Sequence, residues 1–377
     1  NVNINIQQKN NQSFNSFFIN NKAADDKGGA IYASYNVKAI NTLFKGNSAL
    51  VDGGAIYAED NVVVNNCLFE SNKADGASVL SCYGGAIRAK DDTHVINSTF
   101  KNNYAENRGG AIYSDTLALE GATYFENNIA RDHGGAIYTD TFRKDIKNAT
   151  FINNNAQTGD GGAIYIDSKN YISISECEFI NNKCKGDGGA IYVDSSSSHL
   201  WLTKNIFSGN SAGTGQSVYN WGAYEQISCN FWTGKNPNSN NDQLIRWGLF
   251  SDDHYSDSNP IKLDLVFDVD MDDNYEVFLN VKVFFFKSDN TLFTDVFDIS
   301  DINFTVTVDD MPAKTRNEEI DRNSVSFDFT PHTKNLVSVH YRGYNLSKLV
   351  TIEYSLDLLA SCGYDMDSIL KSIKSVK

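Results

Sequence analysis

The chain has 377 residues, and its 47 Asp and Glu residues against 32 Lys and Arg give a formal net charge of −15. Such an acidic surface argues against nucleic acid or an anionic membrane surface as a partner. The sequence contains no apolar run long enough to cross a bilayer, so we expect no membrane insertion. The first residue is Asn1, and we expect a piece of a longer protein with more than one domain.

A pentapeptide, Gly-Gly-Ala-Ile-Tyr, recurs along the first 220 residues. The third copy ends in Arg and the eighth reads Gly-Gln-Ser-Val-Tyr. Each copy follows a Phe-x-x-Asn-x-Ala motif, in which Cys184 replaces the seventh Ala. A period of 25 to 31 residues is typical of a unit that buries its apolar face by stacking on its neighbours. The copies start at Gly28, Gly53, Gly84, Gly109, Gly134, Gly161, Gly188 and Gly215.

Alternation within each repeat predicts which side chains face inward. Side chains two positions apart in a strand share a face. After Gly-Gly-Ala, the Ile and the small or aliphatic sixth residue share one face, while the Tyr and the polar seventh residue share the other. We therefore expect Ile inward and Tyr outward. Phe, Asn and Ala of the second motif should also face inward, with Phe stacked on Phe and each Asn amide bonded to the next Asn or to a turn carbonyl.

The repeat predicts a coil of strands. No apolar stripe of helical spacing occurs within a unit, which excludes a leucine-rich repeat. The stretch between each Tyr and the next Phe has room for one further strand and two turns. Three strands per coil describe an all-β, single-stranded parallel β-helix, right-handed like other parallel crossovers. At roughly 4.8 Å per coil, eight to nine coils make a rod about 40 Å long.

The chain divides by composition. We place the parallel β-helix at residues 1–232, a C-terminal cap and connector at 233–259, an Ig-like β-sandwich at 260–355, and a short helical tail or the start of a further module at 356–377. After Pro260 the Gly-Gly motif is gone and longer alternating segments follow, as in a Greek-key sandwich. These seven segments span residues 261–271, 276–286, 291–297, 302–308, 324–329, 336–341 and 348–354.

The two motifs carry a family resemblance. GGAIY paired with FxxNxA resembles the repeats of the chlamydial polymorphic membrane proteins. The segment CNFWTGKNP, followed by an Ig-like module, is similar to the large adhesin-like proteins of methanogenic archaea. The resemblance covers residues 14–240 and, more loosely, 260–355. It implies an extracellular, cell-surface rod that attaches to a glycan or protein of another cell.

The outward Tyr column is the candidate ligand-binding site. A row of exposed rings offers stacking surfaces to sugar rings, and the phenol groups add hydrogen bonds. Alternatively, Tyr is a good strand residue whose stacking across coils stabilises the rod. The column consists of Tyr32, Tyr57, Tyr113, Tyr138, Tyr165 and Tyr192.

An Asp column beside the Tyr column is the candidate metal site, formed by Asp115, Asp140, Asp167 and Asp194. Like charges held about 4.8 Å apart repel each other. Solvent, side-chain splay, Arg143 and Lys144, or bridging Ca²⁺ would relieve that repulsion. A second acidic run, residues 268–274, has calcium-loop spacing but lacks the Gly and the distal Glu of such loops. We expect no cofactor, with calcium left open.

The cysteines predict small buried residues. Cys67, Cys177 and Cys229 each lie two residues before a Phe, and Cys184 takes an inward Ala position. Disulfides between Cys67 and Cys82 or between Cys177 and Cys184 remain open.

Taken together, these patterns favour a monomeric, non-enzymatic attachment protein that binds a glycan or another cell-surface component through an exposed face of the rod. A purely structural spacer is the main alternative. A polysaccharide lyase or glycoside hydrolase is the third, and it would need acids beside a base or paired carboxylates. The repeats offer few cations near the Asp column, and their largest insertion is only residues 75–83.

Overall fold

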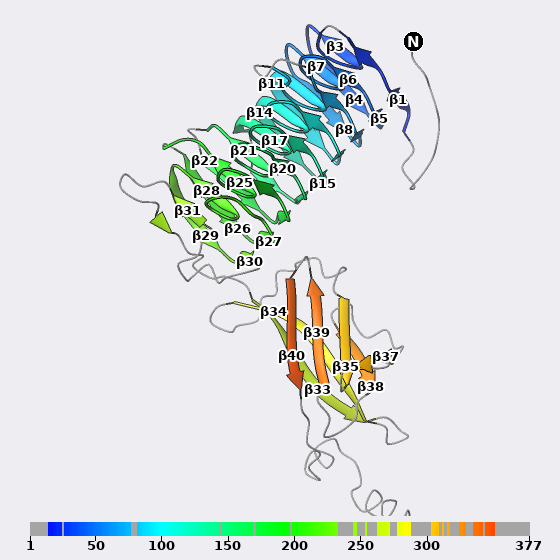
Figure 1. Cartoon of the computed structure of the whole chain (residues 1–377), viewed down its shortest axis with the longest axis vertical. Coiled ribbons are helices and arrows are strands. Elements are labelled where there is room, and N and C mark those ends of the chain that lie inside the picture. Colours follow the sequence, from blue (N-terminus) through cyan, green and yellow to red (C-terminus); the bar gives the residue numbers. More distant parts are fainter. Residues whose placement is uncertain are drawn as a thin grey trace, which may run out of the picture. The chain divides into compact units, whose positions relative to one another are not determined.

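The computed structural model describes residues 14–24, 26–76, 81–143, 145–168, 171–196, 198–232, 244–246, 253–254, 262–271, 277–287, 303–308, 311–312, 315–316, 324–328, 335–341 and 344–350. Every regular element in these residues is a strand (Figure 1). The chain divides into two compact units, Asn1–Pro260 and Ile261–Lys377. The expected helical tail, the first 13 residues and most of the expected cap lie outside the described residues.

The first unit is a parallel β-helix of about eight turns (Figure 1). The repeat predicts three strands per coil, whereas most coils have four, because a residue of positive φ such as Asn20 or Gly46 divides the Phe-x-x-Asn-x-Ala motif into two strands. Each Phe-x-x-Asn-x-Ala motif contributes to two sheets. The first, which we call the Phe sheet, contains β1 (Ser16–Ile19), β5 (Thr42–Lys45), β9 (Leu68–Glu70), β12 (Thr99–Lys101), β15 (Thr123–Glu126), β19 (Ala149–Ile152), β23 (Glu178–Ile180), β27 (Ile206–Ser208) and β30 (Phe231–Trp232). The second, the Ala sheet, contains β2 (Lys22–Ala23), β6 (Ser48–Ala49), β10 (Lys73–Ala74), β13 (Tyr104–Ala105), β16 (Ile129–Ala130), β20 (Asn155–Ala156) and β24 (Lys183–Cys184).

The pentapeptides form a third sheet, the GGAIY sheet. Its strands are β3 (Ile31–Ala33), β7 (Ile56–Ala58), β11 (Ile87–Ile96), β14 (Ile112–Glu120), β17 (Ile137–Phe142), β21 (Ile164–Ile166), β25 (Ile191–Val193) and β28 (Val218–Asn220). Because every pair is parallel and in register, each Tyr lies beside the Tyr, or Arg88, of the next coil.

The last strand of each coil forms one further face, which we call the third-strand face. In the early coils it is built by β4 (Val37–Ile40), β8 (Val62–Asn65) and the second halves of β11 and β14, all continuous with the GGAIY sheet. In the later coils it is a separate sheet of β18 (Ile146–Lys147), β22 (Tyr171–Ser175), β26 (His199–Thr203) and β29 (Ala223–Ser228). The change between the two halves occurs near Arg143.

The paired glycines allow the tight stacking of the coils. Gly134 has φ of +66°, a left-handed conformation that glycine adopts without steric cost. At Gly135 a Cβ atom would lie 2.0 Å from the carbonyl oxygen of Gly162 in the next coil. The first glycine therefore makes the turn, and the second makes room for the neighbouring backbone.

Two buried columns form the centre of the rod, and both confirm the predicted facing. Phe rings stack nearly parallel along the axis, as in the pair Phe69 and Phe100 with centroids 4.7 Å apart. Beside them runs a ladder of buried Asn side chains. Asn128 Nδ2 donates to Asn154 Oδ1 at 3.0 Å and to the Phe100 carbonyl at 2.9 Å, and the same pattern repeats along the rod. Every buried amide in the ladder thus finds its partner in an adjacent coil.

The C-terminal end of the first unit differs in one register detail from the sequence interpretation. Trp232, rather than Phe231, occupies the Phe column, because β30 pairs Phe207 with Trp232, whose rings stack at 4.4 Å. Beyond it, β31 (Leu244–Arg246) continues the GGAIY sheet from β28 in parallel. The next strand, β32 (Asp253–His254), pairs with β31 in the antiparallel direction. These two strands fall in the segment that we assigned to the cap.

The second unit contains two antiparallel sheets. One has the order β33 (Lys262–Met271), β34 (Val277–Phe286), β38 (Ser324–Asp328) and β37 (Thr315–Arg316). The other has the order β36 (Met311–Pro312), β35 (Asn303–Val308), β39 (Asn335–Tyr341) and β40 (Tyr344–Val350). Lys348 of β40 forms an ion pair with Asp264 of β33, so the first and last of these strands meet. The expected segment 291–297 and residues 272–274 of the acidic run lie outside the described residues, and the Ig-like assignment stays a prediction.

Candidate functional site

The predicted exposure of the Tyr column is wrong for most of its members. The side chains of Tyr57, Tyr138, Tyr165 and Tyr192 are buried, Tyr113 is half-buried, and only Tyr32 among the predicted six is exposed, at 51%. The physical reason is that the rings stack on one another. The centroids of Tyr138 and Tyr165, for example, are 4.8 Å apart with their planes within 8°. Each ring thereby covers the faces that we expected a sugar to use.

Side chains from neighbouring positions lie against the same rings. Lys27 lies 4.4 Å from the Tyr57 ring centroid, and Arg108 lies 5.0 Å from that of Tyr138. His133 contributes its ring to Tyr165 at 4.7 Å. These residues precede the Gly pairs, so the turn before each pentapeptide covers the column from one side. The alternative role of the Tyr column, stacking that stabilises the rod, agrees with this packing.

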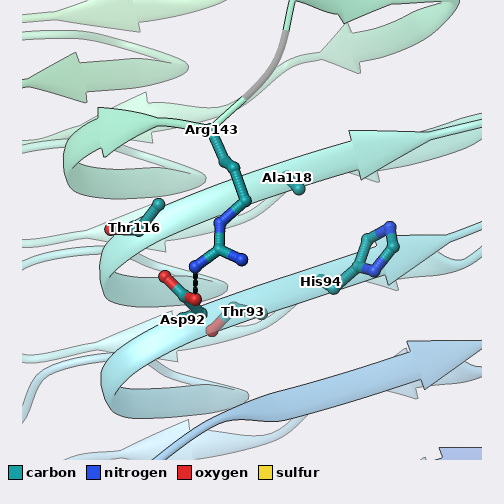
Figure 2. A pocket seen from close by; sticks show the side chains of 6 residues that line it. All are labelled: Asp92, Thr93, His94, Thr116, Ala118 and Arg143. Carbon is teal, nitrogen blue, oxygen red and sulfur yellow. Dashed lines mark ion pairs between the residues drawn. The ribbon is translucent and has the colours of Figure 1, made fainter.

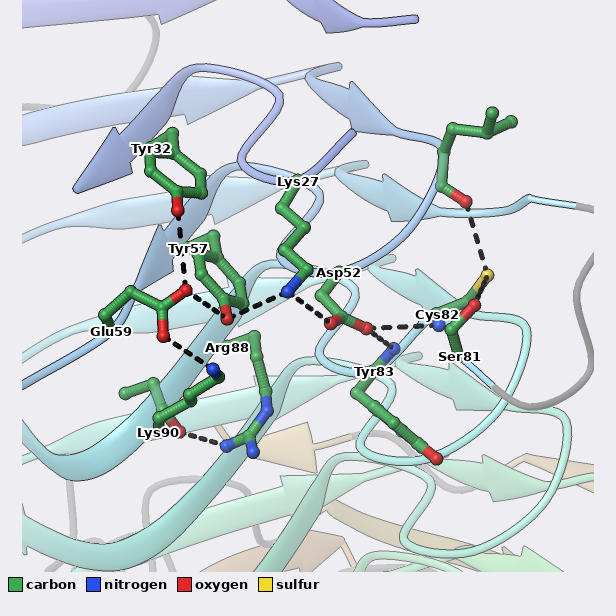
Figure 3. A network of polar contacts seen from close by, with 12 residues as sticks. Lys27, Tyr32, Asp52, Tyr57, Glu59, Ser81, Cys82, Tyr83, Arg88 and Lys90 are labelled. Carbon is green, nitrogen blue, oxygen red and sulfur yellow. Dashed lines mark hydrogen bonds and ion pairs between the residues drawn. The ribbon is translucent and has the colours of Figure 1, made fainter. Parts of the chain in front are cut away.

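A polar network joins the first Tyr residues to charged groups (Figure 3). Lys27 Nζ donates to Tyr57 Oη at 3.0 Å, and Tyr57 Oη donates to Glu59 Oε1 at 3.0 Å. Lys90 Nζ pairs with Glu59 at 2.6 Å, and this contact, with the Tyr57 bond, lowers the pKa of Glu59. The Tyr57 ring is thus fully buried, and its hydroxyl is bonded within the protein.

Asp115 and Asp194 of the Asp column have partners within the protein that relieve their negative charge. Asp115 pairs with Arg88 at 3.3 Å, and Asp194 accepts a hydrogen bond from Tyr165 Oη at 2.5 Å. Burial, and then the like charges of Asp115 and Asp167, raise the pKa of Asp140 to about 6. Arg143 does not contribute, because it pairs with Asp92.

Among the residues that the structure describes, no three His, Cys, Asp or Glu side chains gather as a metal site would require. The Asp column is thus a row of neighbours along the rod and not a cluster, and calcium remains an untested alternative.

The cysteines of the described residues are free thiols, so neither of the two disulfides left open by the sequence is present. Burial raises the pKa of Cys177 to about 12. Cys229, however, does not share the position of Cys67 and Cys177. Because Trp232 occupies the Phe column, Cys229 shifts to the preceding turn, where its φ is +58°.

A groove on the third-strand face was not anticipated by the sequence interpretation (Figure 2). We call it the Arg143 groove. It lies over β4, β8, β11 and β14 and consists of two hollows of about 430 and 180 Å³, which share Asp92, His94 and Arg143 as lining residues. A bulge in the pairing of β11 with β14, between Ala89 and Asp92, sets the position of Asp92.

Several polar groups in and beside the Arg143 groove contact one another. The Arg143 side chain runs back past Thr116 to form an ion pair with Asp92 (Figure 2). His94 Nε2 lies 3.3 Å from Glu120 Oε2. At the other end, Asn61 Nδ2 donates to Asn36 Oδ1 at 2.9 Å. The arrangement presents hydrogen-bond donors and acceptors side by side in a shallow hollow.

Exposed aromatic rings lie on the same face in the later coils. We call this cluster, Tyr171, His199 and Trp201, the aromatic platform. Tyr171 is 69% and Trp201 44% exposed. The Tyr171 and His199 rings stack at 4.7 Å, and Trp201 meets Tyr171 edge-on at 6.3 Å. The signal was present in the sequence, since alternation with buried Ile and Leu residues places all three side chains outward.

Comparison with known families agrees with the architecture. Residues 75–231 match the model of the right handed beta helix region, and residues 15–34 and 41–59 match the Chlamydia polymorphic membrane protein repeat. The chain is a parallel β-helix repeat protein. The predicted right hand and the resemblance to polymorphic membrane protein repeats are thereby confirmed, whereas the archaeal resemblance stays a prediction. No curated protein and no solved structure shows significant similarity to the chain.

The repeats and the β-helix together fit a surface adhesin-like or autotransporter-like protein. In the described part of the chain, no helix has the length and apolar character needed to span a membrane.

Proposed function

We propose that this protein is a non-enzymatic, cell-surface attachment protein whose β-helix binds a glycan through the third-strand face. The cell-surface location in this proposal is supported by the match to the polymorphic membrane protein repeats, whose family is named for membrane proteins. Its site comes from the one observation that distinguishes this face, namely exposed aromatic rings beside a polar hollow. The partner is a glycan of another cell or surface.

The aromatic platform supports a glycan as ligand. A pyranose has an apolar face of C–H groups, which packs on an aromatic ring, and a rim of hydroxyls, which needs polar partners. Tyr171 and Trp201 supply the rings at 69% and 44% exposure. Large aromatic side chains also lose little conformational entropy on binding, which makes them common anchors at recognition surfaces.

The Tyr column is not the site in this proposal. Its rings cover one another, and opening the stack would expose rings that now lie in a buried cluster of their own. A ligand that needed those faces would have to separate coils whose backbones are paired in register. The third-strand face requires no such rearrangement, because its rings are exposed already.

The test is glycan-array binding by the whole chain and by two exposed-residue variants. Trp201→Ala and Tyr171→Ala should each weaken binding by about tenfold or more, equivalent to a stacking contact of at least about 1.4 kcal/mol. Tyr124→Ala is the matched control, because Tyr124 is 48% exposed but lies on the Phe sheet. It should bind like the parent chain.

Two outcomes would overturn the proposal. Equal binding by the parent and by Trp201→Ala would remove the platform from the site. A parent chain that binds no glycan on the array would favour a spacer that displays other domains. The same samples, assayed for new reducing or unsaturated ends, test the third alternative, since any release of such ends would indicate a polysaccharide-cleaving enzyme.

A further inference from the structure

We infer that the aromatic platform and the Arg143 groove are two parts of one extended site, and that its ligand is a linear, uncharged glycan lying along the axis of the rod. The inference rests on the proposed function and specifies the ligand's charge, its length and a second set of contacts.

Register places the two parts in line. Tyr171 lies opposite His199 in the pairing of β22 with β26, and Asp92 lies opposite Thr116 in the pairing of β11 with β14. Ile146 pairs with Ile174, and Arg143 and Tyr171 each lie three residues before one of these two. In the pairing of β14 with β17, Thr116 lies opposite Thr141, two residues before Arg143. The groove and the platform therefore lie on successive coils of one face, with Arg143 displaced by two residues from the register of Thr116. We call these outward residues the outward column; along the rod they are Asn61, Asp92, Thr116, Arg143, Tyr171 and His199.

The spacing of the coils sets the length of the site. From Asp92 to His199 the column rises by four coils, which is about 19 Å at roughly 4.8 Å per coil. A monosaccharide cannot reach both ends of such a site, whereas a linear oligosaccharide of several units can. The straight column on a parallel β-helix thus favours an extended chain over a branched or terminal sugar.

Charge favours an uncharged ligand. The groove is lined by Asp92, Arg143 and Lys38, and Glu120 lies beside it, 3.3 Å from His94. These two acids and two cations cancel, and the pair of Arg143 with Asp92 uses two of the four charges on each other. The whole chain carries −15, so a polyanionic glycan would be repelled at long range. A guanidinium, a carboxylate and two amides are, by contrast, a suitable set of donors and acceptors for hydroxyl groups.

Arg143 is the central residue of this arrangement. Its side chain is 60% exposed, while that of Asp92 is 22% exposed. The ion pair fixes the guanidinium over the groove, yet Asp92 can accept only part of what the five N–H donors of an arginine offer. The remaining donors are available to hydroxyl groups of a ligand in the groove.

The experiment measures affinity against ligand length by calorimetry with the whole chain. The probes are neutral gluco-, manno- and galacto-oligosaccharides of two to eight units, each compared with a uronate oligosaccharide of equal length. Affinity for the neutral series that binds should rise by about tenfold or more once the oligosaccharide spans both parts. Uronate oligosaccharides should bind more weakly than neutral ones of the same length.

Three variants separate the parts of the site. Arg143→Gln should abolish the gain with length but keep the affinity for short oligosaccharides, and Asp92→Asn should reduce the same gain from the other side of the ion pair. Trp201→Ala should weaken binding at every length. Arg131→Gln is the matched control, because Arg131 is an exposed arginine paired with Glu106 away from the third-strand face.

The results separate failure of the extended site from failure of the proposed function. Binding without any dependence on length, tighter binding of uronates, or equal behaviour of Arg143→Gln and Arg131→Gln would each overturn the extended site while leaving the platform and the proposed function intact. Failure of every probe to bind the parent chain would overturn the proposed function, and the extended site with it.

Discussion

Two sets of aromatic side chains point away from the core of this β-helix, and they differ in solvent exposure. In the GGAIY sheet, Tyr138 and Tyr165 are only 5% and 6% exposed. On the third-strand face, Tyr171 is 69% and Trp201 44% exposed. Both sets obey the same alternation, so alternation alone does not determine exposure.

Repetition explains the difference. The pentapeptide brings a Tyr to the same position in nearly every coil, and the coil spacing matches the thickness of stacked rings, so each ring buries its neighbours. The third strand has no residue that recurs in most coils at its outward positions. Tyr171 stacks on His199, whereas the preceding coils carry Arg143 and Thr116 on this face, so no ring from those coils covers the platform. A uniform outward column stabilises the rod, and a varied one is available for recognition.

The largest expected effect on stability comes from removing a ring of the Tyr column, and it tests directly whether the two sets of rings differ in role. Tyr138→Ala should lower the free energy of unfolding by about 3 kcal/mol, because it removes a buried ring stacked between two others. Trp201→Ala, although it removes a larger side chain, should change stability by about 0.5 kcal/mol or less. Urea denaturation of both variants measures the difference. Similar losses for the two would mean that the rings of the platform also serve the fold.

The same comparison between core and surface can be made with asparagine, because the chain has one in the buried ladder and another in the Arg143 groove. Asn128→Ala removes one amide that bonds Asn103, Asn154 and the Phe100 carbonyl inside the rod, so we expect a loss of about 2 kcal/mol. Asn61→Ala removes an amide of the Arg143 groove, where water can replace the lost partners, and should cost about 0.5 kcal/mol. Hydrogen exchange of the adjacent coils reports each loss locally. A larger loss for Asn61 would contradict the assignment of the groove to binding.

Much of this fold could be predicted because each residue of the repeat has one physical role. The spacing of the glycines gave the coil length. Asn and Ala of the second motif share parity, whereas Phe lies three residues before Asn and faces inward with it because a left-handed residue, such as Asn127 with φ of +55°, stands between them. Register at the last coil was missed, because Phe231 and Trp232 are both large aromatics and only strand pairing shows which one joins the column. The second unit offered no repeat, so its strands were predicted from alternation alone.

The candidate site was harder to predict than the fold. The Tyr column attracted attention because it recurs, yet recurrence is what buries it. The Arg143 groove depends on a bulge near Asp92 and on an arginine that crosses from another coil. Neither leaves a motif in the sequence. Tyr171 and Trp201 could have been found, since the alternation that we used for the repeats also applies to the third strand.

The smallest expected effect concerns Asp140 and its pH dependence. Its pKa of about 6 in the folded protein lies above the ordinary value, so folding favours the protonated form. The charged form destabilises the rod above pH 6, and that penalty disappears as the pH falls toward 4. Asp140→Asn should therefore stabilise the protein by about 0.5 kcal/mol at pH 7.5 and by almost nothing at pH 4. Urea midpoints of parent and variant at the two pH values measure this.

Asp115→Asn is the matched control, because Asp115 lies in the same column but pairs with Arg88 at 3.3 Å. Its replacement removes an attractive contact as well as a like charge, so no gain at neutral pH is expected. If both variants stabilise the protein equally, the repulsion is shared along the whole column and the Arg88 pair does not relieve it. If the gain of Asp140→Asn persists at pH 4, its origin is not charge, and the acid column is no more than another outward row whose residues pack as neighbours.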